Sequence, residues 1–259
     1  MRVAVLTTGL LQAFTAASAV SRKRCQYPTP EPLDGCPADT VLVGPLQHFN
    51  TVQSAILSLP HDTSPQHILV LPGNYTEQVN ITRAGPVYLY GQTKDPNDQS
   101  KNTVNIIWHN ATGAAVHSTL DNAYTSVLTV APTFNSSTTG SGPNGNPVPA
   151  DTAFGNTDFR AYNLNLINDF KPYTSGPSLA VSVSYANAGF YHCGFYSYQD
   201  TVSSILPPPR PATPHNQPPH PSPRSTLANS PTRTFTAAKS PARPTSSTAS
   251  APHGSSRVC

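Results

Sequence analysis

The chain has 259 residues, of which 29 are proline and only 10% are charged, and its formal net charge is +3. A chain of this length suits one or two domains with an ordinary hydrophobic core. Residues 25–200 hold 12 acidic and 5 basic side chains, so this stretch is acidic, and it offers no basic face for nucleic acid. No apolar run is long enough to span a bilayer, which excludes a membrane protein.

The N-terminal residues 1–19 have the features of a secretory signal. Arg2 supplies the positive start, an apolar stretch follows, and Ala17-Ser18-Ala19 is a small-residue cleavage site. Export is further indicated by four Asn-x-Ser/Thr sequons. These sequons begin at Asn74, Asn80, Asn110 and Asn135. We therefore expect a secreted, extracellular glycoprotein.

Two of the four cysteines are placed so that they could pair in an oxidising compartment. Cys25 and Cys36 lie close together in a Pro-rich segment, 20–39, and are expected to pair as a disulfide. Cys193 lies within a strand pattern and is expected to be a buried free thiol.

One short helix and then a series of short strands are predicted between residues 40 and 205. Thr51 is a suitable N-cap for an amphipathic helix that Pro60 ends. The following apolar runs, each bounded by Gly, Pro, Asn or Asp, are expected to be strands: 68–71, 79–81, 87–90, 104–108 and 126–130. No second helical period follows, which argues against alternating strands and helices.

Two later segments, 159–168 and 190–200, resemble one another. Each begins with an aromatic residue and then alternates apolar and polar positions, and their starts are 31 residues apart. Such a spacing suits successive coils of a solenoid, in which Asn163 and Asn165 would form amide ladders with neighbouring coils. A β-sandwich shows similar short strands, so the pattern alone leaves both folds open.

The composition changes sharply after Val202. Residues 206–259 are dominated by Pro, Ser, Thr, Ala and Arg and contain no acidic side chain. A segment of this composition buries too little apolar surface to offset its ordering entropy, so we expect it to be a disordered tail.

Four motifs follow one another along the chain. They begin with Phe49–Ile56 and Gly73-Asn74-Tyr75-Thr76-Glu77, continue with Val87–Gly91, and end with Tyr198-Gln199-Asp200-Thr201. Taken together and in this order, they resemble the motifs of the pectin methylesterases, and most closely those of secreted fungal members. The resemblance covers roughly residues 40–203. It implies an all-β fold, the right-handed parallel β-helix, over 40–205, incomplete at its C-terminal end.

The resemblance also implies a chemistry. Enzymes of this family hydrolyse the methyl esters of galacturonate in plant-wall pectin without a metal or organic cofactor. One Asp attacks the ester and a second, protonated Asp delivers a proton to the departing methanol. By position, Asp200 matches the general acid/base and Gln199 matches a donor to the oxyanion. Gly73, Tyr75 and Glu77 match a family motif with a structural or groove-lining role. We expect a monomer whose partner is pectin.

The sequence departs from the family pattern in two places. The family's Gln-Ala-Val motif is here Ser178-Leu179-Ala180-Val181, and Leu179 cannot donate a side-chain hydrogen bond. No acidic residue follows Asp200, so the nucleophilic Asp expected one coil later is missing, as is the Arg that orients it. We therefore expect an interrupted domain with little or no esterase activity.

Two other functions fit parts of the sequence. A non-catalytic, secreted pectin- or wall-binding protein would keep the groove and carry the Pro/Ser/Thr-rich tail as a stalk. A polysaccharide lyase on the same solenoid would need clustered Asp residues for calcium, and the sparse pairs Asp95/Asp98 and Asp151/Asp158 do not suggest one. For the aromatic residues near Asp200, namely Tyr191, Phe195, Tyr196 and Tyr198, core positions are expected.

Overall fold

The computed structural model describes residues 22–113, 121–140, 145–172 and 174–205. The predicted signal at 1–19 and the predicted tail at 206–259 lie outside these residues. Within them, no helix has both the length and the apolar character needed to cross a membrane.

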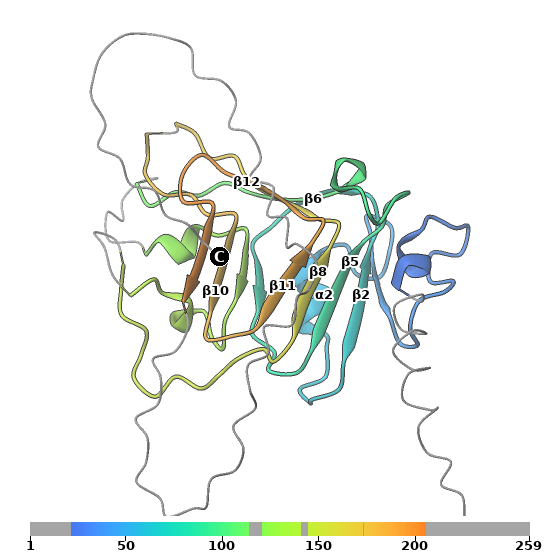
Figure 1. Cartoon of the computed structure of the whole chain (residues 1–259), viewed down its shortest axis with the longest axis horizontal. Coiled ribbons are helices and arrows are strands. Elements are labelled where there is room, and N and C mark those ends of the chain that lie inside the picture. The colour runs from blue at the N-terminus through green and yellow to red at the C-terminus, as the bar shows by residue number, and fades with distance from the viewer. Residues whose placement is uncertain (1–21, 114–120, 141–144, 173, 206–259) are drawn as a thin grey trace, which may run out of the picture.

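The described strands form three sheets, which we name A, B and C, and all neighbouring strands are parallel (Figure 1). Sheet A has the order β1 (Val41–Val43), β2 (Gln66–Val70), β5 (Val87–Gly91), β8 (Phe159–Tyr162) and β11 (Ala188–Tyr191). Sheet B has the order β12 (Gly194–Tyr196), β9 (Asn165–Asn168), β6 (Val104–Trp108) and β3 (Gly73–Thr76). Sheet C has the order β13 (Val202–Ile205), β10 (Val181–Ser184), β7 (Leu128–Val130) and β4 (Val79–Ile81).

Successive strands along the chain belong to different sheets, and this arrangement defines the architecture. From β2 onward the chain passes through sheets A, B and C in turn and then returns to sheet A, so β2 pairs with β5, β3 with β6 and β4 with β7, and this order repeats along the described strands. This is a parallel β-helix, as the family resemblance implies, and the β-sandwich alternative is excluded.

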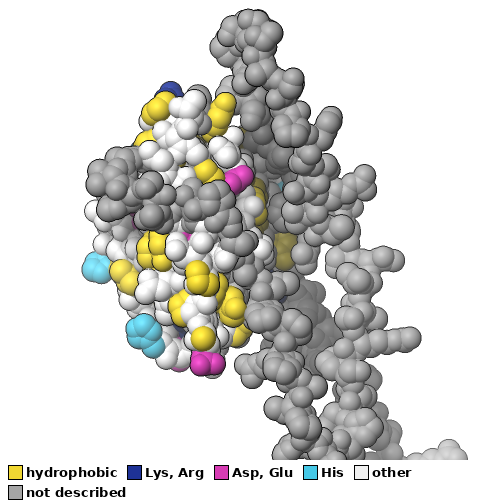
Figure 2. All heavy atoms as spheres, turned by 90° about the vertical axis from the view of Figure 1, so that its left-hand side faces the viewer, with side chains coloured by type: hydrophobic (Ala, Val, Ile, Leu, Met, Phe, Trp, Pro, Cys, Tyr) yellow, Lys and Arg dark blue, Asp and Glu magenta, His cyan; other side chains and the backbone are white. Residues whose placement is uncertain are grey.

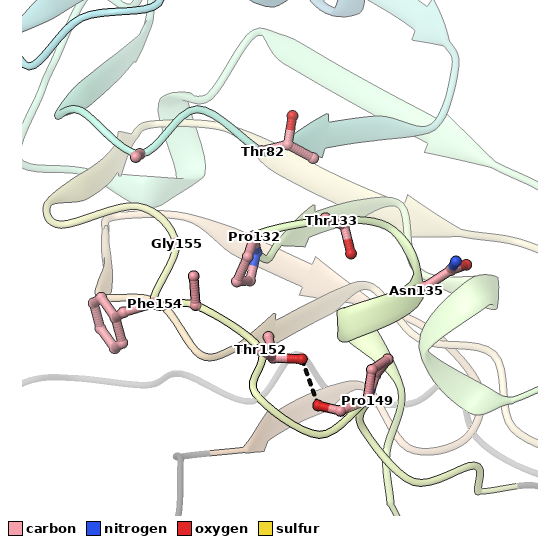
Figure 3. A pocket seen from close by; sticks show the side chains of 10 residues that line it. Thr82, Pro132, Thr133, Asn135, Pro149, Thr152, Phe154 and Gly155 are labelled. Atoms are coloured by element: carbon pink, nitrogen blue, oxygen red, sulfur yellow. Dashed lines mark hydrogen bonds between the residues drawn. The ribbon is translucent and has the colours of Figure 1, made fainter.

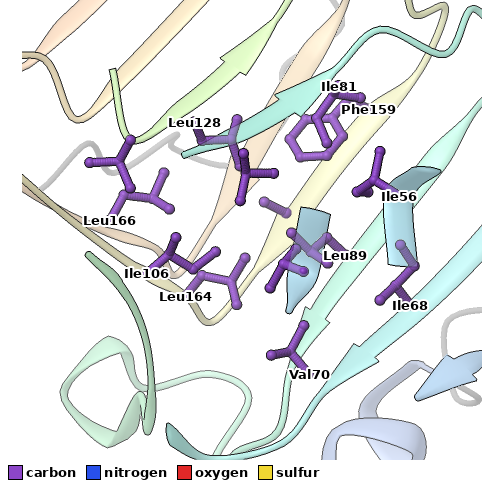
Figure 4. Packing of buried hydrophobic residues seen from close by; sticks show 14 of the residues in the cluster. Ile56, Ile68, Val70, Ile81, Leu89, Ile106, Leu128, Phe159, Leu164 and Leu166 are labelled. Atoms are coloured by element: carbon purple, nitrogen blue, oxygen red, sulfur yellow. The ribbon is translucent and has the colours of Figure 1, made fainter. Parts of the chain in front are cut away.

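The core lies inside the coils, where the three sheets face one another (Figure 4). Side chains alternate along each strand, so every second position points inward. In sheet A, for example, Ile68, Leu89, Ala161 and Phe190 form one inward row across four strands. Burial of each large aliphatic or aromatic side chain contributes about 1.5–3 kcal/mol relative to exposure.

The register of the last two coils differs from the one that the sequence repeat suggests. Phe159 pairs with Ala188 and Ala161 pairs with Phe190, an offset of 29 residues rather than 31. The same offset of 29 holds in sheet B, where Asn165 pairs with Gly194. The observed register places each Phe beside an Ala, which fills the interior more evenly than two Phe side chains on one rung.

The corners between sheets A and B are tight. Asn163 and His192 occupy them in successive coils with positive φ values of 54° and 52°. Each is followed by an inward side chain, Leu164 or Cys193, and Cys193 is the buried free thiol that the sequence predicts. At the preceding coil's corner, Gly91 lies so close to the Asn163 carbonyl that no side chain fits there.

Asparagine side chains form a ladder on the outer face of sheet B. The Asn165 Nδ2 group donates to Asn105 Oδ1 at 2.9 Å, and Asn105 Nδ2 donates to Asn74 Oδ1 at 2.8 Å. Asn163 Nδ2 donates to Asn102 Oδ1 at 3.1 Å. Both predicted amide ladders are therefore confirmed.

The predicted helix is α2 (Val52–Leu57), and it packs against β1 and β4. Thr51 is its N-cap, with the Ser54 N–H donating to Thr51 Oγ1 at 3.1 Å. Three short 3₁₀ helices lie in the connections between strands. They are η1 (Gln99–Lys101), η2 (Asn122–Thr125) and η3 (Asn135–Ser137).

The Pro-rich N-terminal segment packs on the outer face of sheet A. The predicted disulfide between Cys25 and Cys36 is present, and Cys25 packs against Leu69, Tyr90 and Tyr162. Gln26 is fully buried, and its Nε2 group donates to Gly91 O at 3.0 Å and to Asn163 Oδ1 at 2.9 Å. Residues 22–38 are thereby fixed to the solenoid.

Candidate active site

Asp200 lies in the short loop 197–201 that connects β12 of sheet B to β13 of sheet C. Its φ of 55° is unusual for a residue other than glycine, and such conformations are concentrated at functional sites. Asp200 and Gln199 are both exposed, and among the described residues neither side chain has a hydrogen-bond partner. Both remain available to an external molecule.

The loop is held by the preceding coil on both sides of Asp200. The Ser178 N–H donates to Gln199 O at 3.1 Å, and the Ala180 N–H donates to Thr201 O at 3.0 Å. Within the loop, Ser197 Oγ donates to Thr201 Oγ1 at 2.9 Å. Asp200 is thus placed by a fixed backbone rather than by contacts of its own carboxylate.

The preceding coil does not offer the side-chain donor that the family pattern would place beside Gln199. Leu179 is fully buried, and Ser178, the residue whose backbone contacts Gln199, is also buried. In this part of the chain, Gln199 is the amide side chain that stands next to Asp200.

The aromatic residues near the loop are more exposed than the sequence analysis expects. Phe195 is inside, in edge contact with Phe190 at a ring separation of 5.3 Å. Tyr191, Tyr196 and Tyr198, however, are 42%, 39% and 49% exposed, so the expected core position is wrong for these three. Tyr196 follows an inward Phe195, and strand alternation therefore places it on the outer face of sheet B.

A histidine–aspartate pair that the sequence analysis did not predict lies at the C-terminal ends of the sheet B strands, where the Asp200 loop also begins. His109 and Asp169 directly follow β6 and β9, and His109 Nδ1 contacts Asp169 Oδ1. Both side chains are about half exposed. The register that pairs Trp108 with Asn168 brings them together, and 60 residues separate them in the sequence.

The face of the molecule drawn in Figure 2 carries several hydrophobic side chains and few charged ones. In the loop 197–201 and in β13, Asp200 is the only acidic residue. The described residues include no cluster of three His, Cys, Asp or Glu side chains suited to a metal ion.

The Gly73-x-Tyr75-x-Glu77 motif contacts the protein's own backbone. Tyr75 is buried and its hydroxyl donates to Leu71 O at 2.7 Å. The two carboxylate oxygens of Glu77 accept from the Val52 and Gln53 N–H groups, each at 2.8 Å. Glu77 therefore joins the end of β3 to the first turn of α2.

Burial changes the titration of this motif. It raises the pKa of Tyr75 to about 12, with the nearby Glu77 charge acting in the same direction. Burial also raises the pKa of Glu77, and the hydrogen bonds from Gln53 and Val52 oppose that rise. The Glu77 carboxylate is thus a half-buried cap of α2, held by two backbone N–H groups.

We expect Glu77→Ala to lower the free energy of unfolding by about 2 kcal/mol, because two N–H groups at the start of α2 lose their acceptors. Urea denaturation measures this loss, and Glu31→Ala, at an exposed glutamate, is the control expected to change little.

The pH dependence of this contribution has a definite sign. A raised pKa means that the native state keeps the Glu77 proton to higher pH than the unfolded chain does, whose ordinary value is 4.5. Relative to Glu77→Gln, the wild type is therefore most stable below pH 4.5 and loses this advantage as pH rises through the folded pKa. If the unfolding free energies of the wild type and of Glu77→Gln changed in parallel from pH 4 to 7, the raised pKa of Glu77 would be contradicted.

One cavity lined by described residues lies away from Asp200. It has a volume of about 480 Å³ and lies where sheet C leads into sheet A, lined by Thr82, Pro132, Phe154 and their neighbours (Figure 3). The cavity lies at the ends of the sheet C strands from which the chain leaves toward sheet A. The loop 197–201, which carries Asp200, lies at the opposite ends of these strands, where the chain enters sheet C from sheet B.

Comparison with known proteins gives a consistent result. No family model matches the chain. Pectinesterase A of Emericella nidulans is 28% identical over 166 residues, which cover 64% of this chain and 42% of that protein. A probable pectinesterase A of Aspergillus flavus is 30% identical over 203 residues, covering 78% of this chain and 52% of that protein.

The solved structures that are similar to this chain include pectin methylesterases. The Aspergillus niger pectin methylesterase is 26% identical, with a TM-score of 0.49, and the match covers 65% of this chain and 46% of that one. Pectin methylesterase PemA from Erwinia chrysanthemi is 21% identical, with a TM-score of 0.47. The chain spans about half the length of the curated relatives it matches. Over the matched residues, the chain is therefore similar in sequence to fungal pectinesterases.

Proposed function

We propose that this chain binds methyl-esterified galacturonan beside the outer face of sheet B and that Asp200 is the general acid/base of pectin methyl-ester hydrolysis. The observation that carries the proposal is the exposed pair Asp200 and Gln199 on a loop that is hydrogen-bonded to the preceding coil. The chain that carries this loop is similar in sequence to pectinesterases. Similarity to pectinesterases supports the substrate class, and the exposed, anchored loop supports the role of Asp200.

The chemistry needs two carboxyl groups. The first, as a carboxylate, attacks the ester carbon and forms a tetrahedral intermediate whose oxyanion a donor such as the Gln199 amide stabilises. Asp200 then gives its proton to the methoxy oxygen, the carbon–oxygen bond breaks, and methanol leaves with the bonding electron pair. Asp200, now a carboxylate, removes a proton from water, which cleaves the acyl-enzyme and restores both groups.

Only the acid/base member of the pair is assigned in this sequence. No acidic residue follows Asp200 in the 259 residues, and the adjacent donor position is occupied by buried Leu179. We therefore propose that the polypeptide, as its sequence reads, is inactive or only weakly active on pectin esters.

An alternative function, a non-catalytic pectin- or wall-binding protein, is favoured by the exposed tyrosines. Tyr196 and Tyr198 lie in β12 and in the Asp200 loop, where an amphipathic ring suits contact with a sugar face. Both functions require secretion, which the residues 1–19 predict, and both require binding to pectin.

Binding is tested by retention of the purified chain on immobilised methyl-esterified pectin. Tyr196→Ala is expected to weaken retention about fivefold, as loss of one ring contact costs about 1 kcal/mol. Tyr27→Ala is the matched control, because Tyr27 is 53% exposed but lies in the N-terminal segment outside sheet A. Equal retention of the two variants would contradict a binding surface on sheet B.

A further inference from the structure

The four sequons predicted from the sequence have different environments in the fold. Asn74 and Asn135 are exposed, whereas Asn80 and Asn110 are half-buried. N-linked glycosylation joins a large, hydrated oligosaccharide to the Asn Nδ2 atom, so a folded glycoprotein must leave both that atom and the space around it free.

Asn74 meets this requirement because of the direction of the amide ladder. Each ladder amide donates through Nδ2 to the Oδ1 of the next, from Asn165 to Asn105 and from Asn105 to Asn74. Asn74 is the last member, so its oxygen accepts while its nitrogen has no partner among the described residues. A glycan on Nδ2 leaves the Oδ1 acceptor, and hence the ladder, intact.

Asn135 also presents a free side chain. It lies in η3 at the margin of the 480 Å³ cavity, whose other margin carries Phe154 (Figure 3). The neighbouring Phe134 is 39% exposed and stacks on Tyr124 with ring centroids 4.6 Å apart. An oligosaccharide at Asn135 has open space in the cavity and an apolar surface to cover.

Asn80 has the opposite environment. It is the central residue of β4, between the inward Val79 and Ile81, and its backbone N–H donates to Gln53 Oε1 at 2.6 Å. The Asn80 Oδ1 atom is enclosed and has no partner. The half-buried Asn80 side chain therefore leaves little room for an oligosaccharide on its Nδ2 atom in the folded chain.

Asn110 lies in a stretch that is tied to the next coil. Asn168 Nδ2 donates to Asn110 O at 2.9 Å, and the Thr112 N–H donates to Pro177 O at 3.0 Å. The sequon's Thr112 is buried, and Asn110 itself is half-buried. The fold leaves little room for an oligosaccharide here.

We propose that the folded, secreted protein carries N-linked glycans at Asn74 and Asn135 and none at Asn80 or Asn110. In the modification, Nδ2 forms a bond to the anomeric carbon of a lipid-pyrophosphate-linked oligosaccharide and loses a proton. The sugar–phosphate bond breaks, and the lipid pyrophosphate leaves with the electron pair. A chain modified at Asn80 cannot bury this side chain and is absent from the folded fraction.

Two threonine substitutions provide a matched test. Thr76→Ala and Thr82→Ala each remove one sequon, at Asn74 and Asn80, and both threonines are exposed. The full chain is secreted from a eukaryotic host, and the monomeric fraction is analysed by intact mass before and after enzymatic deglycosylation. We expect Thr76→Ala and Asn135→Gln each to remove the mass of one glycan and Thr82→Ala to remove none.

Peptide mapping of the wild type assigns the sites directly and includes Asn110, whose sequon threonine is buried and unsuitable for substitution. We expect glycopeptides that contain Asn74 and Asn135 and unmodified peptides that contain Asn80 and Asn110. A glycan at Asn80 or Asn110 in the folded fraction, or a bare Asn74 or Asn135, overturns the assignment. A protein without any glycan overturns it as well.

Discussion

The purified chain is expected to release methanol from highly methyl-esterified pectin at least ~10⁴-fold more slowly than the Aspergillus niger pectin methylesterase. This deficit corresponds to about 5.5 kcal/mol of lost transition-state stabilisation. The reason is that a nucleophile and its acid work as a unit, and this sequence provides no acid after Asp200. Coupled enzymatic detection of methanol measures both rates on the same substrate.

The variant Asp200→Asn sharpens this expectation. When one member of a catalytic pair is already missing, removal of the other costs little more, so we expect the residual rate to change less than about threefold. Retention on pectin by both proteins shows that the fold persists. A normal rate that Asp200→Asn abolishes would reveal another attacking group, and Asp169→Asn would then test the acid at the same edge of sheet B.

Local chemistry explains why the secondary structure was predictable from the sequence. Thr51 caps α2 as expected, and the apolar runs bounded by turn residues became strands of the solenoid. The repeat between 159–168 and 190–200 indicated coils correctly but gave the wrong register. A shift of two residues keeps every side chain on its own face, so the alternation alone cannot distinguish the two registers.

The contacts between distant coils were not predictable in the same way. His109 and Asp169 meet because β6 and β9 pair, and the connections of irregular length between these strands hide the relation in the sequence. The Gly73-x-Tyr75-x-Glu77 motif was recognisable, but its sequence left open a structural or a groove-lining role. The partners of Glu77, the N–H groups of Val52 and Gln53, become visible only when β3 and α2 are placed together.

Phe159→Ala is expected to lower the free energy of unfolding by about 3–5 kcal/mol, the range for removal of a fully buried aromatic side chain. Phe159 is completely buried, and its ring meets Phe190 at 5.8 Å between centroids. Ala188, its partner across the strands, is too small to fill the resulting cavity. Urea denaturation, followed by circular dichroism, measures the change.

Phe154→Ala is the matched control, because Phe154 is 42% exposed at the cavity margin, and we expect a loss below about 1 kcal/mol. The two substitutions are also expected to differ in their effect on pectin binding. Phe159, Phe190 and Phe195 form a chain of ring contacts that reaches β12, the strand immediately before the Asp200 loop. Phe159→Ala should therefore weaken pectin retention at temperatures where the chain is still folded, and Phe154→Ala should not. Similar losses of stability from both substitutions would mean that the interior of the solenoid is less tightly packed than its contacts indicate.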